Sequence, residues 1–92
     1  MTKVVLDGFI VVPEGDLELV REELLLHTVL TRGEPGCIVF KVDQCPEDRC
    51  KFYVYEEFAS EASFQRHQDR SLTSRWGLVT KDIRRYYNIN RV

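Results

Sequence analysis

Residues 4–12 read VVLDGFIVV, a stretch that decides the fold because it is apolar on both of its faces. Its valines and isoleucine predict a β-strand, and Pro13 ends the strand because proline has no backbone N–H to donate. Side chains alternate along a strand. Two apolar sets therefore face in opposite directions: Val4, Leu6, Ile10 and Val12 in one, Val5, Phe9 and Val11 in the other. Antiparallel sheets normally carry polar residues on a face that meets water, so this strand predicts a sheet covered on both faces.

The rest of the chain predicts a single α+β domain over residues 1–92. A helix is expected over residues 17–32, followed by strands over 37–42 and 51–58. A second helix over 60–69, a further helical turn over 72–79 and a last strand over 83–89 complete the chain. Asp16 and Ser60 are suitable N-caps for the helices, and Gly33 is a suitable stop for the first. The order β-α-β-β-α-β is typical of the ferredoxin-like split βαβ arrangement, a four-stranded antiparallel sheet with helices on one face.

The second apolar face of this sheet predicts a homodimer. The two strands expected over 37–42 and 51–58 repeat the pattern of two apolar faces. In the first, one face carries Ile38, Phe40 and Val42 and the other Cys37 and Val39. In the second, one face carries Phe52, Val54 and Phe58 and the other Tyr53 and Tyr55. Because the helices cover one face only, a second copy packed sheet to sheet is the economical cover for the other. The first helix also has an apolar stripe away from the sheet, Leu19, Leu26 and Leu30, which hints at a higher oligomer or at cover from the C-terminal tail.

Composition excludes several classes of partner. The chain has 92 residues and a formal charge of −2, with 13 basic and 15 acidic residues well mixed along it. Nucleic acid is not expected as a partner, because binding the phosphate backbone requires a face of one positive sign. No window holds the roughly 18 apolar residues of a membrane span, and the N-terminus lacks an apolar signal core. We therefore expect a cytoplasmic protein.

The three cysteines predict reduced thiols rather than a metal site. Cys37, Cys45 and Cys50 make an odd number in a chain without an export signal. Cys45 and Cys50 flank a hairpin tip and could face each other across it, so their redox state stays open. A zinc site would need four ligands with close pairs, and only this loose pair exists.

Several short pieces of sequence form one pattern that spans nearly the whole chain: His27, Thr31-Arg32, Glu34-Pro35-Gly36-Cys37, Tyr55-Glu56-Glu57-Phe58, Ser60, Phe64, His67 and Trp76. This pattern resembles the antibiotic biosynthesis monooxygenase domain family. The resemblance implies a dimeric α+β barrel with a pocket between sheet and helices, and members that include quinol and polyketide monooxygenases working without metal or organic cofactor. Relatives commonly carry a second histidine five residues after the one matching His67, where this chain has Leu72.

Three residues are candidates for catalysis. Cofactor-free oxygenation needs a base to form an electron-rich phenolate, a hydrogen-bond donor to hold it, and a dry cavity. His27 is the candidate base, because the usual imidazole pKa of about 6.5 suits proton transfer near neutral pH. His67 is a second candidate, and Glu56 falls among aromatic residues, where a carboxylate must be paired or have a raised pKa. The structural alternatives are a core histidine and a salt bridge from Glu56 to Arg32, Arg84 or Arg85.

Five further residues are expected to bind a small aromatic substrate: Tyr53, Tyr55, Phe64, Trp76 and Arg32. The two tyrosines suit a dimer interface equally well, and Trp76 suits a core anchor. Two histidines and a glutamate also match the facial triad of non-haem iron enzymes, but they lie on different elements, so we expect no metal. The family resemblance implies no organic cofactor. Haem-degrading relatives carry a helical tryptophan near the position of His67, which disfavours that chemistry.

Three functions remain open from the sequence. The leading one is a cofactor-independent monooxygenase that oxidises a quinol-like or polyphenolic compound with O2. The second is an isomerase or other non-oxidative enzyme on a small polar metabolite, with His27 and His67 exchanging protons. The third is a non-catalytic ligand-binding or dimerisation module, which the leucine at position 72 favours modestly.

Overall fold

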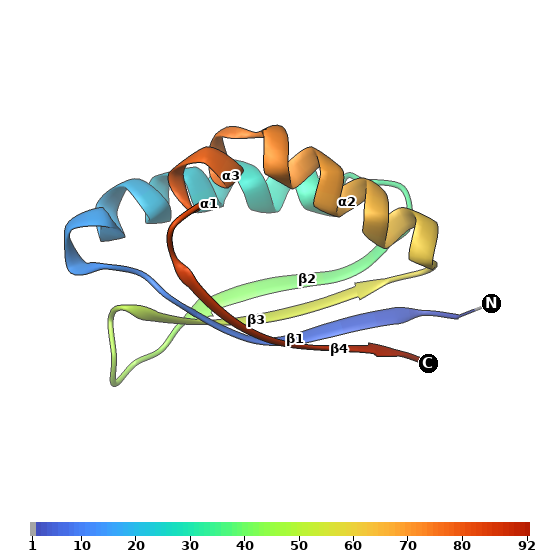
Figure 1. Cartoon of the computed structure of the whole chain (residues 1–92), viewed down its shortest axis with the longest axis horizontal. Helices are drawn as coiled ribbons and strands as arrows, with labels where there is room; N and C mark the ends of the chain where they lie inside the picture. Colours follow the sequence, from blue (N-terminus) through green and yellow to red (C-terminus); the bar gives the residue numbers. More distant parts are fainter. Residues whose placement is uncertain (1) are drawn as a thin grey trace.

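A computed structural model describes residues 2–92 and shows one curved antiparallel sheet with helices along one face (Figure 1). The elements are β1 (Val4–Val11), the 3-10 turn η1 (Glu14–Asp16), α1 (Leu17–Arg32), β2 (Cys37–Gln44), β3 (Lys51–Phe58), α2 (Glu61–Thr73), α3 (Arg75–Val79) and β4 (Arg84–Arg91). The strand order is β2-β3-β1-β4, with every neighbouring pair antiparallel. The predicted ferredoxin-like β-α-β-β-α-β fold is confirmed.

The helix ends follow the sequence signals in part. The Ser60 hydroxyl accepts from the Ser63 backbone N–H at 3.1 Å, and Ser63 Oγ accepts from the Ser60 N–H at 3.1 Å, so the predicted cap of α2 is present. Asp16 stands at the N-cap position of α1 but makes no side-chain cap hydrogen bond, because η1 already turns the chain there. The prediction that the helix of Ser60 ends at Asp69 is wrong, since α2 continues to Thr73.

A bulge in β2 changes which side chains face the helices. The pairing with β3 shifts between Cys37 and Val39, so the strict alternation expected for this strand breaks. Cys37 therefore packs against the core, whereas Ile38 is 54% exposed. The prediction that placed Ile38 with Phe40 and put Cys37 on the opposite side is wrong for this reason.

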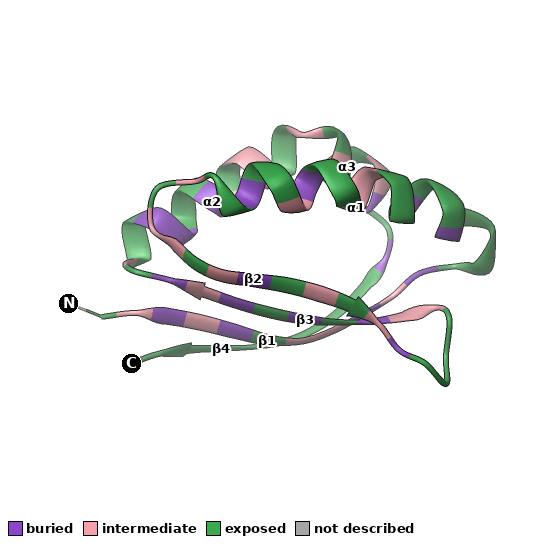
Figure 2. Ribbon diagram, turned by 180° about the vertical axis from the view of Figure 1, so that it is seen from behind, coloured by how far each residue is buried: buried purple, intermediate pink, exposed green. Residues whose placement is uncertain are grey.

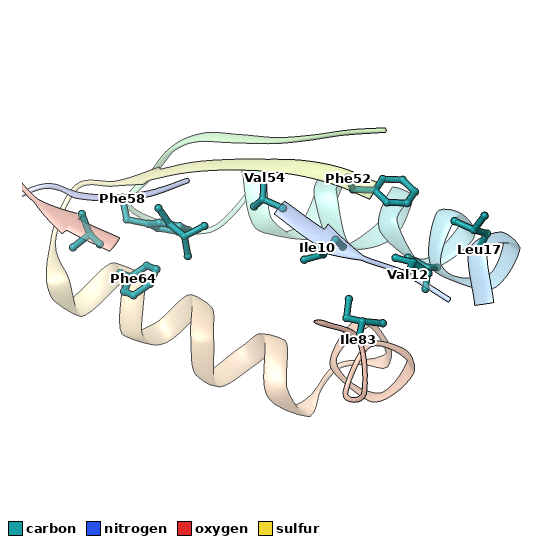
Figure 3. Packing of buried hydrophobic residues seen from close by; sticks show 11 residues of the cluster. Ile10, Val12, Leu17, Phe52, Val54, Phe58, Phe64 and Ile83 are labelled. Atoms are coloured by element: carbon teal, nitrogen blue, oxygen red, sulfur yellow. The ribbon is translucent and has the colours of Figure 1, made fainter. Parts of the chain in front are cut away.

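The core lies between the helices and the sheet face that they cover, called here the inner face. Val4, Leu6, Ile10 and Val12 are buried, as predicted for this side of β1. Figure 3 shows Phe58 and Phe64 packed at one end of the core, while Val12, Leu17, Phe52 and Ile83 gather at the other. Three polar side chains, His27, Glu56 and His67, are also buried, and the His67 ring lies 4.9 Å from that of Phe58.

The opposite side of the sheet, the outer face, is aromatic and open. Phe9 stacks on Tyr86 with 4.8 Å between ring centroids, and Tyr53 and Tyr55 are 45% and 37% exposed. Figure 2 shows buried and less buried residues alternating along β1 and β3, as expected for a sheet covered on one face. This face also carries charged groups, since Lys51 Nζ lies 4.3 Å from the Phe9 ring centroid and Lys3 pairs with Glu57. The chain thus leaves a largely aromatic face of the sheet uncovered, with charges among its rings.

Helix α1 buries the stripe predicted to face the sheet, including Leu17, Val20 and His27. The other stripe is exposed: Leu19 by 42%, Leu26 by 54% and Leu30 by 46%. The C-terminal tail does not cover it, because the Val92 N–H bonds the Lys3 carbonyl at 2.8 Å beside β1. Among residues 2–92, no helix is long and apolar enough to cross a membrane.

All three cysteines are free thiols. Cys45 Sγ lies 3.8 Å from a Glu47 carboxylate oxygen, and Cys50 Sγ lies 3.2 Å from one of Glu14. The two thiols of the hairpin therefore contact different carboxylates.

Candidate active site

A cavity of about 750 Å³ opens between the inner face of the sheet and the segment that joins α2 to α3. Its polar and aromatic wall comes from every layer of the fold: His27 on α1, His67 and Ser71 on α2, Trp76 on α3, Glu56 on β3, and Arg85 and Tyr87 on β4. Side chains that are distant in sequence are thus brought together around one space.

His67 is held by a carboxylate on the side away from the cavity. Its Nδ1 lies 2.8 Å from Glu34 Oε1, and Glu34 Oε2 accepts from Arg70 Nε at 2.7 Å. A carboxylate acceptor favours a proton on Nδ1, which leaves Nε2 with a lone pair that can accept a proton. Nε2 lies 3.5 Å from the Ser71 hydroxyl oxygen and 3.7 Å from Glu56 Oε1. Burial lowers the pKa of His67 below its usual 6.5, and Glu34 opposes that shift, so the ring is neutral at pH 7.

His27 presents a neutral imidazole without a polar partner. Its ring stacks on Trp76 at 4.8 Å with 12° between planes, and its centroid lies 5.6 Å from that of His67. Burial, followed by the charges of His67 and Arg70, lowers the pKa of His27 to about 3. The buried Nδ1 has no hydrogen-bond partner in the described part of the chain, so a bound molecule can supply one.

Glu56 is a carboxyl group poised to change its protonation state. It is 6% exposed, and its Oε1 makes no hydrogen bond to any described residue. Burial and, secondly, the negative charge of Glu34 raise the pKa of Glu56 from 4.5 to about 7. The expected salt bridge to an arginine is wrong: Arg32 donates to the Phe40 carbonyl at 2.9 and 3.1 Å, and Arg85 donates to Thr80 Oγ1 at 3.0 Å. Glu56 and His67 can therefore pass a proton between them after a small approach.

Comparison with known proteins agrees with this architecture. Residues 4–76 match the family model described as antibiotic biosynthesis monooxygenase. The chain belongs to this family. No curated protein matches it by sequence.

Solved structures of low sequence identity share the fold of this family member. A conserved protein of unknown function from Bacteroides thetaiotaomicron is 17% identical with a TM-score of 0.83, covering 99% of this chain and 98% of that one. PA3566 from Pseudomonas aeruginosa is 24% identical with a TM-score of 0.80, covering 100% and 93%. A structure described as antibiotic biosynthesis monooxygenase is 19% identical with a TM-score of 0.73, covering 100% and 96%.

The cavity of this family member includes some of the residues expected to bind substrate and leaves out others. Trp76 lines it beside His27. Phe64 lies in the apolar core, where its ring meets Phe58 at 5.7 Å. Tyr53 and Tyr55 stand on the outer face, away from the cavity. Arg32 donates to the Phe40 carbonyl at the end of α1 and does not line the cavity either. Of the five predicted substrate contacts, the structure therefore brings only Trp76 to the cavity.

The sequence does not reveal several residues that support or line the cavity. Glu34 holds His67, and Arg70 holds Glu34 in turn. Arg70 follows His67 by three positions and so shares its side of α2. Tyr87 stands two residues after Arg85 on β4, and residues at this spacing lie on the same face of a strand. Burial of its hydroxyl, and then Glu56, raises the pKa of Tyr87 to about 12. Only the pairing of β4 with β1 shows which face this is.

Leu72 stands on the rim of the cavity and is 77% exposed. The side chain at position 72 therefore lies at the mouth of the cavity and not in the buried polar cluster. Within residues 2–92, no three His, Cys, Asp or Glu side chains converge in a way that could hold a metal ion.

Proposed function

We propose that this protein is a monooxygenase that oxidises a small phenolic or quinol-like compound with O2, using no metal or organic cofactor. Membership of the antibiotic biosynthesis monooxygenase family supports an oxidative activity. The observation that carries the chemistry is the chain of groups from Arg70 through Glu34 to His67, whose Nε2 lies beside Glu56 at the cavity.

The first step is removal of the substrate's hydroxyl proton by His67 Nε2. The imidazolium that forms is stabilised by the Glu34 carboxylate 2.8 Å from Nδ1, in the manner of a carboxylate-oriented general base. His27 was the base expected from the sequence, but it has no carboxylate partner and its pKa of about 3 makes it a weak proton acceptor. We therefore assign the base to His67 and a hydrogen bond with the bound substrate to His27.

The second step is transfer of one electron from the phenolate to O2, which gives a substrate radical and superoxide. Their recombination forms a carbon–oxygen bond, and cleavage of the O–O bond then leaves a carbonyl on the substrate. One oxygen atom enters the product, and the other leaves as water with two hydrogen atoms from the substrate. Glu56, with a pKa of about 7, is suited to supply a proton to the leaving oxygen.

Oxygen uptake with a panel of hydroquinones and electron-rich polyphenols tests this function. Wild-type protein should consume O2 above the rate of autoxidation, and His67→Asn should reduce the excess by about 100-fold or more, in the range of a lost general base. Arg66→Gln, on the exposed side of α2, serves as the control and should retain the rate. Equal uptake by wild type and His67→Asn across the panel would exclude the proposal.

The same groups favour one second candidate, a non-oxidative proton transfer such as isomerisation. Glu56 and His67 form an adjacent carboxyl and imidazole, a pair that can remove a proton at one carbon and return it at another. Exchange of substrate C–H for deuterium in D2O without O2 uptake would identify this activity. A ligand that binds with neither exchange nor uptake would identify a binding module.

A further inference from the structure

Positive charge gathers around the cavity of a protein that is acidic overall. The chain has a formal charge of −2, yet Arg75, Lys81 and Arg85 line the cavity together with a single carboxylate, Glu56. That carboxylate has a pKa of about 7, so half of its charge is absent near neutral pH. A cavity wall of one sign raises the local concentration of ligands of the opposite sign.

Two of these cations are available to a ligand. Arg75 is held by Glu23, with 3.0 Å between Nε and Oε2. Arg85 contacts three neutral oxygens, Thr80 Oγ1 at 3.0 Å, the Ile83 carbonyl at 3.3 Å and the Tyr87 hydroxyl, so its charge has no carboxylate partner among the described residues. Lys81 is exposed and forms no ion pair with any residue from 2 to 92.

Arg85 and Glu56 stand at different levels of the sheet wall of the cavity. On the inner face, Leu6 of β1 pairs with Glu56 and Ile10 of β1 pairs with Arg85. These two levels of the sheet are separated by about 13 Å along the strand, at about 3.3 Å per residue. Tyr87 lies between the two levels, because it pairs with Gly8 of β1. Burial is the main cause of its raised pKa; the Glu56 charge adds to the rise and the Arg85 charge opposes it, so Tyr87 interacts with both groups.

We propose that the substrate is an acidic phenol, whose hydroxyl meets His67 and whose carboxylate is bound by Lys81 and Arg85. This inference rests on the proposed function for the phenol part and on the cavity's charge for the acid part. A guanidinium and an ammonium on one side of a carboxylate give charge-assisted hydrogen bonds, while the ring lies against Trp76 and Tyr87.

The test compares 2,5-dihydroxybenzoate with 2,5-dihydroxybenzamide, which differ in charge but hardly in shape. Affinities are measured by calorimetry under nitrogen, so turnover does not enter. Wild-type protein should bind the acid at least about tenfold more tightly than the amide, and the preference should shrink as salt rises. Lys81→Gln and Arg85→Gln should each remove most of the preference, whereas Arg66→Gln, an equal loss of charge outside the cavity, should leave it intact.

The outcomes separate this inference from the oxidative function. Equal affinity for acid and amide, or binding of neither, overturns the acidic-substrate inference whatever the oxygen-uptake assay shows. A preference that persists in both Lys81→Gln and Arg85→Gln overturns the assignment of these residues. Benzoate binding as tightly as 2,5-dihydroxybenzoate would support the acid part and count against a phenol. Trp76 is the only tryptophan, so its single indole N–H resonance should shift on binding if the ligand enters this cavity.

Discussion

At the scale of single residues, the role of base proposed for His67 depends on the Glu34 carboxylate. The carboxylate fixes the proton on Nδ1 across 2.8 Å and would stabilise the imidazolium formed in the reaction. Glu34→Gln keeps an acceptor oxygen but removes the charge. We expect kcat for phenol oxidation to fall by about 100-fold with little change in KM, because the lost stabilisation belongs to the charged state.

Steady-state oxygen uptake measures this effect. Glu61→Gln is the matched control, since its carboxylate pairs with Arg91 on the surface, and it should leave kcat unchanged. A Glu34→Gln enzyme as fast as wild type would show that His67 works without its carboxylate.

Glu56 should make folding stability depend on pH in an unusual direction. Its pKa rises from 4.5 in the unfolded chain to about 7 in the fold, so the folded state holds the proton more tightly between these values. Stability from this group is present below pH 4.5 and is lost as the pH rises through 7, by up to about 3 kcal/mol for a shift of this size. His27 acts in the opposite sense: its pKa of about 3 removes stability as the pH falls below 6.5.

Glu56→Gln removes the pH dependence of stability that comes from Glu56 and keeps the one that comes from His27. The free energy of unfolding of the variant, relative to wild type, should therefore increase between pH 4.5 and pH 7.5 by up to about 3 kcal/mol. Urea unfolding at several pH values in this window measures the difference. A difference that stays constant with pH would mean that Glu56 has an ordinary pKa in the fold.

At the scale of elements, the N-terminus of α2 orients the helix that carries His67 and Arg70. The reciprocal hydrogen bonds of Ser60 and Ser63 satisfy backbone donors at this end, and Gly36 packs beside Ser63 with a φ of 89° that disfavours other residues. Ser60→Ala should lower the free energy of unfolding by about 1 kcal/mol.

Chemical denaturation of the variant checks this value. Thr2→Ala, an exposed hydroxyl outside the helices and strands, should change the free energy by much less. If both substitutions have the same effect, the capping bonds of Ser60 contribute nothing to stability.

The elements also show where sequence patterns are informative and where they are not. Apolar periodicity and turn residues predict α1 and β3 to the residue, because both have one clearly buried side. The bulge at Ile38 leaves no mark in the apolar pattern of β2, since both of its sides are apolar. The end of α2 was missed because its last turn, from Arg70 to Thr73, carries mostly polar residues and is held by contacts from outside the helix.

At the scale of the whole molecule, the outer face of the sheet is left exposed by this chain. Helices cover one face only, and the other carries the stacked pair of Phe9 and Tyr86 and the exposed ring of Tyr53. We propose that a second copy covers this face in a two-fold homodimer. Tyr53→Glu should shift the protein from dimer to monomer, because it places a charge in the buried interface.

Light scattering after size exclusion chromatography gives the mass directly. Leu26→Glu, at a site of similar exposure on the far side of α1, should leave the dimer intact. A dimer that dissociates with Leu26→Glu and persists with Tyr53→Glu would place the interface on the helices.

The cavity was less accessible to sequence reasoning than the fold was. His27, His67 and Glu56 are indeed brought together, because each stands at a sheet-facing or helix-inward position that periodicity identifies. The roles of Glu34 and Arg70 could not be foreseen, since their contact joins residues 36 positions apart. Alternation separates the two faces of a strand but does not show which face meets the cavity, so the sequence pattern could not place Tyr53 and Tyr55 on the outer face.

The central claim is that O2 reacts with a phenolic substrate in this cavity and delivers one of its atoms to the product. Turnover under 18O2 with mass spectrometry of the rapidly reduced product tests the claim most directly, with a parallel reaction in 18O-labelled water. We predict one 18O atom per product molecule from 18O2, none from water, and at least 100-fold less labelled product from His67→Asn. Product that forms without an atom of 18O, or that forms equally well with His67→Asn, would contradict it.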